Sequence, residues 1–271
     1  MGKNKKDTLG DRMKESYENR SKTYLTRRTP CIIRLDGKAF HSFTKGLKRP
    51  YDEVFHNTMN STLMYLCQNI QGCKFGYTQS DEITLVLTDF DNLDTDAWFD
   101  YSVQKMCSIS ASLATLAFNR YFEKYANEAC DAICELQDQD IEAKYLASLR
   151  KCIDKGALFD ARCFSIPEDE VVNCLIWRQQ DATRNAVQML GQVHFSSGQL
   201  HKKSTNMIQE MLWQEKGINF NDMPIAFKRG VCCFKVDAPN GHRTWYLDEY
   251  GPIFTQDRNY IEQHISVKTY K

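Results

Sequence analysis

The sequence lacks any apolar run approaching the roughly 20 residues that a membrane-spanning helix needs. Its opening residues, MGKNKKDTLGDRMKES, are polar and contain no apolar core of a secretion signal. These two absences predict a cytoplasmic protein without a membrane partner.

Paired cysteine motifs are also missing. The eleven cysteines form no Cys-x-x-Cys pair and no Cys/His cluster at zinc spacing. The nearest approaches are Cys130 with Cys134 and the adjacent Cys232 and Cys233. An odd and scattered set is typical of reduced thiols that pack as small hydrophobic groups, so we expect neither a disulfide framework nor a structural zinc ion.

Net charge is absent too, because 35 lysines and arginines balance 35 acidic residues. This balance argues against a protein that coats nucleic acid through bulk electrostatics. Basic residues nevertheless gather near the amino terminus: Lys3, Lys5, Lys6, Arg12, Lys14, Arg20, Lys22, Arg27 and Arg28. Such a region is consistent either with contacts to RNA phosphates or with a solvated helix.

Hydrophobic periodicity predicts an α+β fold. Strands are expected at 30–35, 74–77, 83–87 and 157–166, and amphipathic helices at 51–70 and 97–125. The polar turn 78–82 joins the second and third strands as a hairpin. The order strand, helix, strand, strand, helix, strand is the ferredoxin-like βαββαβ arrangement, an antiparallel sheet with helices on one face.

The rest of the chain is expected to extend this core. Helices are predicted at 8–24, 127–155, from 167 onward and at 204–216, with strands near 231–236 and 244–247. No internal repeat or low-complexity linker interrupts the sequence. We therefore expect a single catalytic domain over residues 1–271, with a core at about 30–166 and a C-terminal helical and strand extension at about 167–271.

Acidic residues stand at two predicted strand ends, Asp36 after the first strand and Asp81 with Glu82 in the hairpin turn. If the first strand lies beside the strand that follows the first helix, these carboxylates converge at one rim of the sheet. Two Mg²⁺ ions about 4 Å apart, held by such oxygen ligands, can clamp the attacking and leaving oxygens of a phosphoryl transfer. Either acidic turn alone is more often structural.

Five motifs carry a family resemblance. They are Arg34-Leu-Asp-Gly-Lys-Ala-Phe-His-Ser-Phe43, Arg49-Pro-Tyr-Asp52, Tyr77-Thr-Gln-Ser-Asp-Glu82, Trp177-Arg-Gln-Gln-Asp-Ala182 and Lys228-Arg-Gly230. In order and approximate spacing they resemble the tRNA-histidine guanylyltransferase family over roughly residues 30 to 230. The resemblance implies a polymerase-like palm that adds nucleotides to the 5′ end of a tRNA in the 3′-to-5′ direction. It also implies two Mg²⁺ ions, ATP and GTP or another nucleoside triphosphate as substrates, and a homo-tetramer.

The resemblance assigns roles to particular residues. Asp36, the backbone carbonyl of Gly37 and Asp81 resemble the family's metal ligands, and Glu82 is expected to support the catalytic pair. The residues that resemble the nucleotide-binding set are Gly37, Lys38, Ala39, Phe40, His41, Arg49, Ser80 and Asp81. An aspartate followed by glycine suits this task, because glycine lets the backbone approach a triphosphate closely. The side chains of Phe40 and Phe43 are expected to pack in the core.

One segment departs from the eukaryotic pattern. Where those enzymes carry histidine-isoleucine-asparagine-asparagine, this chain has Thr183-Arg-Asn-Ala186, in which Asn185 aligns with a family asparagine. The segment resembles the guanylyltransferase-like proteins of bacteria, archaea and phages, which implies template-dependent repair of shortened 5′ ends. Dedicated guanosine addition to histidine tRNA is the alternative.

Two other functional classes are alternatives to a tRNA nucleotidyltransferase. A palm-type nucleotide cyclase also pairs aspartates, but its hairpin would carry a Gly-Gly-(Asp/Glu)-Glu-Phe run where this chain has Gln79-Ser-Asp-Glu82. A non-enzymatic tRNA-binding or chaperone module would not need the aspartate pair.

Overall fold

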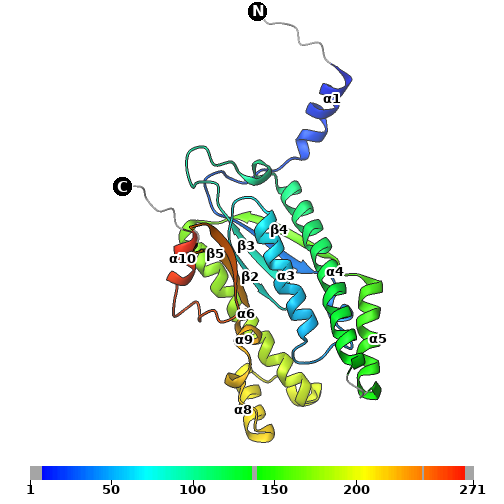
Figure 1. Ribbon diagram of the computed structural model, residues 1–271. Helices are drawn as coiled ribbons and strands as arrows, with labels where there is room; N and C mark the ends of the chain where they lie inside the picture. Colours follow the sequence, from blue (N-terminus) through cyan, green and yellow to red (C-terminus); the bar gives the residue numbers. More distant parts are fainter. Residues whose placement is uncertain (1–7, 136–138, 240, 266–271) are drawn as a thin grey trace, which may run out of the picture.

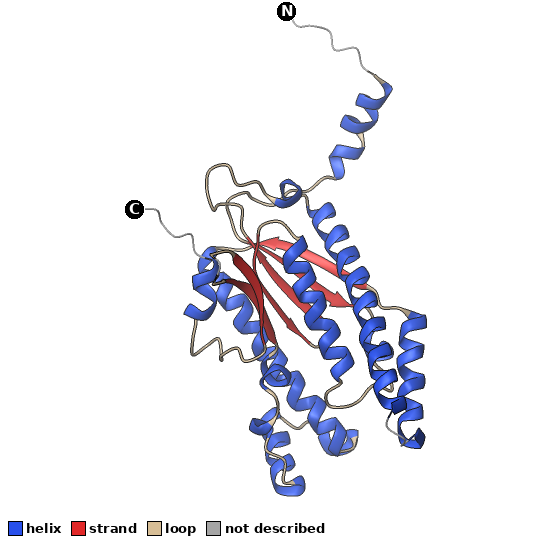
Figure 2. Ribbon diagram, in the orientation of Figure 1, coloured by secondary structure: helices blue, strands red, loops and turns tan. Residues whose placement is uncertain are grey.

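A computed structural model describes residues 8–135, 139–239 and 241–265. Its six-stranded sheet has the order β4-β1-β3-β2-β5-β6, with antiparallel pairing between all neighbours (Figures 1 and 2). The strands are β1 (Cys31–Gly37), β2 (Cys73–Gln79), β3 (Glu82–Leu87), β4 (Phe159–Ser165), β5 (Val231–Asp237) and β6 (Arg243–Asp248). The first four strands confirm the predicted ferredoxin-like arrangement. One detail was wrong, because β1 lies beside β3 rather than beside β2.

The α-helices follow the strands in the expected alternation. They are α1 (Leu9–Ser16), α2 (Phe40–Phe43), α3 (Glu53–Asn69), α4 (Val103–Glu135), α5 (Gln139–Lys155), α6 (Glu168–His194), α7 (Ser197–Leu200), α8 (Thr205–Lys216), α9 (Ile225–Arg229) and α10 (Asn259–Ile265). Short 3-10 helices lie at Glu18–Ser21 (η1), Trp98–Tyr101 (η2) and Phe220–Asp222 (η3).

Both faces of the central strands β1, β2 and β3 are buried. On β1, Ile33 and Leu35 pack with α3 and α4, whereas Ile32 packs with Val171 of α6 and Ile261 of α10. The crossover helices α3 and α4 therefore cover one face of the sheet, as expected. The second face is covered by α6 and α10 of the C-terminal extension. Burial on both sides explains why β1 reads as an almost continuous apolar run rather than an alternating one.

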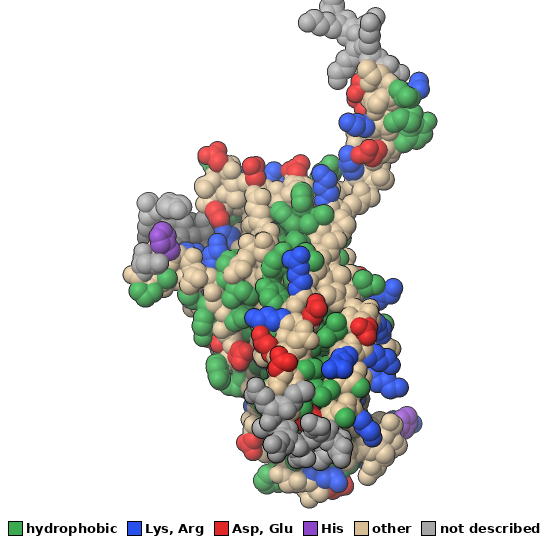
Figure 3. Space-filling model, turned by 45° about the vertical axis from the view of Figure 1, so that its right-hand side comes forward, with side chains coloured by type: hydrophobic (Ala, Val, Ile, Leu, Met, Phe, Trp, Pro, Cys, Tyr) green, Lys and Arg blue, Asp and Glu red, His purple; other side chains and the backbone are tan. Residues whose placement is uncertain are grey.

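The amino-terminal helix is shorter than predicted. A helix over 8–24 was expected, but α1 ends at Ser16 and η1 follows after Tyr17. Figure 1 shows α1 projecting away from the body of the molecule, so packing does not extend it. Apolar side chains of Leu9, Met13 and Tyr17 are exposed, with exposed fractions of 66%, 43% and 68%, and Figure 3 shows this apolar surface on the projecting helix.

The second long helix also differs from its prediction. It was expected over 97–125, whereas α4 begins at Val103 and runs to Glu135. Trp98 and Tyr101 are buried in η2, and Tyr101 has a positive φ angle of 55°. This bend turns both aromatic rings into the core before the helix begins, although their spacing resembles that of a continuous helix.

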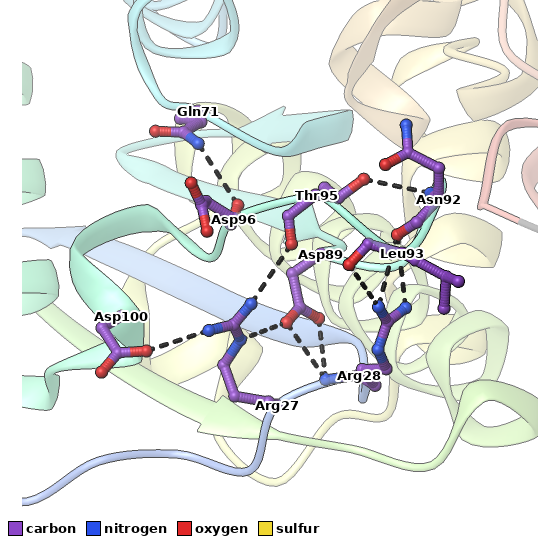
Figure 4. A network of polar contacts seen from close by, with 9 residues as sticks. All are labelled: Arg27, Arg28, Gln71, Asp89, Asn92, Leu93, Thr95, Asp96 and Asp100. Atoms are coloured by element: carbon purple, nitrogen blue, oxygen red, sulfur yellow. Dashed lines mark hydrogen bonds and ion pairs between the residues drawn. The ribbon is translucent and has the colours of Figure 1, made fainter.

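Two exposed arginines of the basic amino-terminal region are hydrogen-bonded to other groups of the protein (Figure 4). The Nε of Arg27 donates to Asp89 at 2.6 Å, and its guanidinium also donates to Asp100 at 3.0 Å. The Arg28 backbone N–H donates to the same Asp89 carboxylate at 2.9 Å, while its guanidinium bonds to the carbonyl of Leu93. Arg27 and Arg28 thus hold the loop after β3, which argues against the phosphate-contact interpretation for these two. Lys3, Lys5 and Lys6 lie outside the described residues.

Removal of the Arg27 side chain is expected to destabilise the fold. Asp89 is fully buried, and Arg27→Ala leaves its carboxylate without the guanidinium that compensates its charge. We expect the free energy of unfolding, measured by urea denaturation, to fall by more than it does in a surface control. The control is Arg12→Ala on the exposed helix α1, which should change it by less than about 0.5 kcal/mol. Equal losses in the two variants would contradict a special role for the buried ion pair.

Candidate active site

Asp36 lies near the end of β1, between two other acidic residues. It stands directly opposite Glu82 of β3 and opposite Asp160 of β4. Residues that oppose each other in neighbouring strands direct their side chains to the same face of a sheet. The three carboxylates therefore belong to one face at the same rim.

Asp81 reaches this rim through the turn between β2 and β3. Ser80 takes a positive φ angle of 50° in that turn and donates from its hydroxyl to the Asp81 carboxylate at 3.1 Å. The Gly37 N–H donates to the backbone carbonyl of Asp81, also at 3.1 Å. The structure thereby joins the Asp36-Gly37 pair to Asp81, although 45 positions separate the two aspartates in the chain.

The electrostatics of this rim favour a bound cation. Burial raises the pKa of the Asp81 carboxyl, the Ser80 hydroxyl opposes that rise, and the negative charge of Asp36 adds to it. The ionised form of Asp81, which burial and the charge of Asp36 disfavour, would be stabilised by a positive ion beside it.

The donor set fits magnesium. Across the described ranges, no three His, Cys, Asp or Glu side chains gather as a complete metal cluster. Two carboxylates and the Gly37 carbonyl supply only oxygen atoms, and Mg²⁺ typically takes one or two carboxylates and completes its shell with water and substrate phosphates. The residues at this rim therefore suit Mg²⁺ carried with a triphosphate better than a permanently enclosed metal.

The segment after β1 is shaped by close packing. A Cβ atom on Gly37 would lie 2.3 Å from the Phe40 ring, so only glycine fits beneath that ring. Ala39 has a positive φ angle of 55°, which turns the chain into α2. Phe40 and Phe43 are both buried, as expected, and the Phe40 ring lies 5.3 Å from that of Phe118. Phe40 thus anchors the segment, while Lys38, Ala39 and His41 are exposed around it.

An open pocket lies beside this rim, and we call it the phosphate pocket. The predicted residues Phe40, His41, Arg49, Ser80 and Asp81 are among those that line it. Lys48 lies next to Arg49 on the same wall, and both side chains are exposed. The pocket therefore combines two cationic side chains with the Asp81 carboxylate, which is the chemistry expected of a metal–triphosphate site.

Glu82 has a different environment from the aspartates. Its side chain is buried, and its Oε2 accepts from Arg178 of α6 at 2.8 Å. Burial raises the pKa of Glu82, and the charges of Arg178 and Arg34 partly offset that rise. The ion pair joins β3 to α6, so the structure favours Glu82 as a positioning residue over a metal ligand.

The motif that begins at Trp177 supplies Arg178 and further contacts around this ion pair. The Arg178 guanidinium lies 3.6 Å from the centroid of the half-exposed Trp177 ring, and Arg178 also contacts Asp181 at 3.4 Å. Thr183, which stands where eukaryotic relatives have histidine, donates to the Lys228 carbonyl at 2.9 Å. The hydroxyl thus ties α6 to the end of α9.

A family comparison agrees with this geometry. The model of the tRNAHis guanylyltransferase family matches residues 10–167, which is more than half of the chain. The chain belongs to the tRNAHis guanylyltransferase family. The match includes β1, the hairpin turn and both aspartates, so the rim described above lies within the family region.

Solved structures extend the family similarity to the C-terminal part. A bacterial tRNA(His) guanylyltransferase-like protein in complex with ATP is 38% identical, with a TM-score of 0.81, over 96% of this chain and all of that one. A structure of such a protein in complex with GTP is 36% identical, with a TM-score of 0.72, over 96% and 99%. An uncharacterized protein of Acanthamoeba polyphaga mimivirus is 29% identical over 239 residues, 83% of this chain and 76% of the relative.

Among the helices of the described residues, none is long and apolar enough to cross a membrane.

Sequence reasoning predicted the aspartate rim but missed Tyr51, His56 and Asn60, which line a second pocket beside it. His56 and Asn60 fit the pattern of an ordinary amphipathic helix, whereas Tyr51 lies within the Arg49-Pro-Tyr-Asp52 motif but was given no role of its own.

Proposed function

We propose that this protein is a Mg²⁺-dependent nucleotidyltransferase that adds nucleotides to the 5′ end of a tRNA in the 3′-to-5′ direction. The observation that carries the proposal is the joining of Asp36 and Asp81 at one rim, beside a pocket lined by Arg49. Family membership supports the tRNA and the nucleotide as substrates. The bacterial neighbours described with ATP and with GTP support a nucleoside triphosphate in this pocket.

Asp36, the Gly37 carbonyl and Asp81 would hold Mg²⁺ in this proposal. When bound, the ions would neutralise charge on the phosphates and favour departure of the leaving group. Arg49 orients the triphosphate against the rim, and His41 lies within the same pocket as a further donor. Arg178 keeps Glu82 and the hairpin in place behind the aspartates. The protein thus contributes to catalysis mainly by positioning the substrates and by matching the charges of their phosphates.

A homo-tetramer is part of the proposal. The exposed apolar side chains of Leu9, Met13 and Tyr17 on the projecting helix α1 support association, because exposed apolar surface of this kind is typical of an interface. The proposal is independent of the catalytic argument.

The catalytic proposal predicts strict dependence on a divalent cation. Incubation with labelled GTP or ATP and a set of intact and 5′-truncated tRNAs should give products extended at the 5′ end. Chelation by EDTA should abolish the extension and added Mg²⁺ should restore it, as followed by gel electrophoresis of the labelled RNA. Turnover of a nucleoside triphosphate without tRNA would favour the cyclase, and RNA binding without any extension would favour the non-enzymatic module.

A further inference from the structure

A second pocket adjoins the phosphate pocket, and we call it the amide pocket. The two share the walls formed by Asp52, Phe55, Ser80 and Met189, among others. The amide pocket encloses about 660 Å³ of empty space, including the open water at its mouth. Its residues come from α3, β2, α6 and α9, so the sheet and three helices hold it in shape.

The walls of the amide pocket are apolar and aromatic. Met59, Ala182 and Ala186 line its depth, and the rings of Tyr51 and Phe227 face its side at 6.3 Å from each other, edge to face. Such a lining suits a flat ring system rather than a hydrated phosphate or sugar.

A buried amide points to a polar ligand. Asn60 is 5% exposed, and its Nδ2 donates to Glu249 Oε1 at 2.7 Å. His56 Nε2 lies 3.0 Å from the same Glu249 oxygen, and its ring packs against Tyr51. Because these contacts hold the NH₂ group of Asn60 toward Glu249, its Oδ1 remains an acceptor without a hydrogen-bond partner. Buried polar atoms rarely lack a hydrogen-bond partner unless a ligand or a water molecule supplies one.

Two further amides line the same pocket. Gln79 lies at the end of β2, next to Ser80, and Asn185 lies on α6. Within the part of the chain that the structure describes, neither side chain makes a hydrogen bond. Each carries a donor and an acceptor side by side, which is the complement of a nucleobase edge.

We infer that the amide pocket binds the base of one of the two nucleotides that the reaction joins. Apolar walls would cover the faces of the base, and Asn60, Gln79 and Asn185 would bond to its edge. Ser80 belongs to both pockets and contacts Asp81, so a nucleotide whose base lies here directs its phosphates toward the aspartate rim. The inference rests on the proposed function and names two sources for the base, a free nucleoside triphosphate or the terminal nucleotide of the RNA.

Substitutions at the unpaired amides test the inference without disturbing the fold. We would compare Asn185→Ala and Gln79→Ala with Gln188→Ala, which removes an exposed amide of α6 outside the pocket. Dissociation constants would be measured by equilibrium dialysis for ATP, GTP, CTP, UTP, inorganic tripolyphosphate and a 5′-triphosphorylated oligoribonucleotide. Loss of one hydrogen bond should weaken binding of the preferred base about tenfold. Binding of tripolyphosphate, and all binding by Gln188→Ala, should be unchanged.

The pattern of losses identifies the source of the base. Weaker binding of a free nucleoside triphosphate alone assigns the pocket to the incoming nucleotide, and weaker binding of the oligoribonucleotide alone assigns it to the RNA end. Unchanged dissociation constants in both variants, or an equal loss for tripolyphosphate, would overturn the inference. Binding requires no turnover, so base-dependent binding in a protein that extends no tRNA would refute the proposed function and retain the amide pocket only as a nucleobase site.

Discussion

Asp36→Ala and Asp81→Ala should each reduce nucleotide addition by several orders of magnitude while the fold is retained. Each substitution removes one of the two carboxylates assigned as metal ligands, and the described residues hold no cluster of three His, Cys, Asp or Glu side chains that could bind the ion instead. Neither side chain is fully buried, so alanine opens no core cavity. Single-turnover rates with a labelled nucleoside triphosphate would measure the loss, and circular dichroism would show unchanged secondary structure.

A matched control separates this effect from a general loss of negative charge. Asp154→Ala removes an exposed carboxylate from α5 that is not among the residues lining the phosphate pocket, and should leave the rate unchanged. If either rim variant kept nearly full Mg²⁺-dependent activity, the assignment of these aspartates as metal ligands would be wrong.

Efficient addition of G is expected opposite a templating C on a tRNA that lacks its first nucleotide. Addition opposite the unpaired discriminator base of full-length histidine tRNA should be slower by about tenfold or more, because a base pair supplies hydrogen bonds that the protein need not provide. Thr183 replaces the histidine of the eukaryotic pattern, and its hydroxyl is engaged with the Lys228 carbonyl. No imidazole is therefore available at that position to handle the 5′ end.

Single-turnover rates on both tRNAs, measured with each of the four nucleoside triphosphates, would distinguish repair of truncated tRNA 5′ ends from maturation of histidine tRNA. A truncated tRNA with a different templating base serves as the control, because the preferred nucleotide should change with the template. Faster addition opposite the discriminator base, or indifference to the template, would favour dedicated histidine-tRNA maturation.

Local patterns in the sequence were sufficient for the core of the fold. The β-branched run before Asp36 and the helical spacing over 51–70 predicted β1 and α3, because periods of 2 and 3.6 residues follow directly from strand and helix geometry. The same reasoning failed at 8–24 and at 97–125. Beyond η1 the chain is held in an extended path, because Tyr24 forms a β-bridge with Ser102, and in η2 the burial of Tyr101 requires a bend that spacing does not reveal.

Charge along the sequence was an incomplete guide to function. Arg27 was a candidate for contact with RNA until the structure showed it paired with the buried Asp89, 62 positions away. Arg49, in contrast, is exposed in the phosphate pocket and makes no ion pair within the described residues, whereas the neighbouring Lys48 is paired with Glu142 at 3.3 Å. A basic side chain is available to a ligand only if no acidic residue of the fold has engaged it, and the pairing depends on tertiary contacts.

The sequence by itself determined the family, the order of the core elements and the two acidic turns, because each is encoded within a few consecutive residues. Only the tertiary structure decided how these parts meet. It set β3 rather than β2 beside Asp36, paired Glu82 with Arg178, and brought Asn60 to Glu249 across 189 positions. These contacts join residues that are distant in the chain, and their energies depend on burial and on the choice among competing partners. Local periodicity does not predict which partners pair, so the amide pocket could be identified only from the tertiary structure.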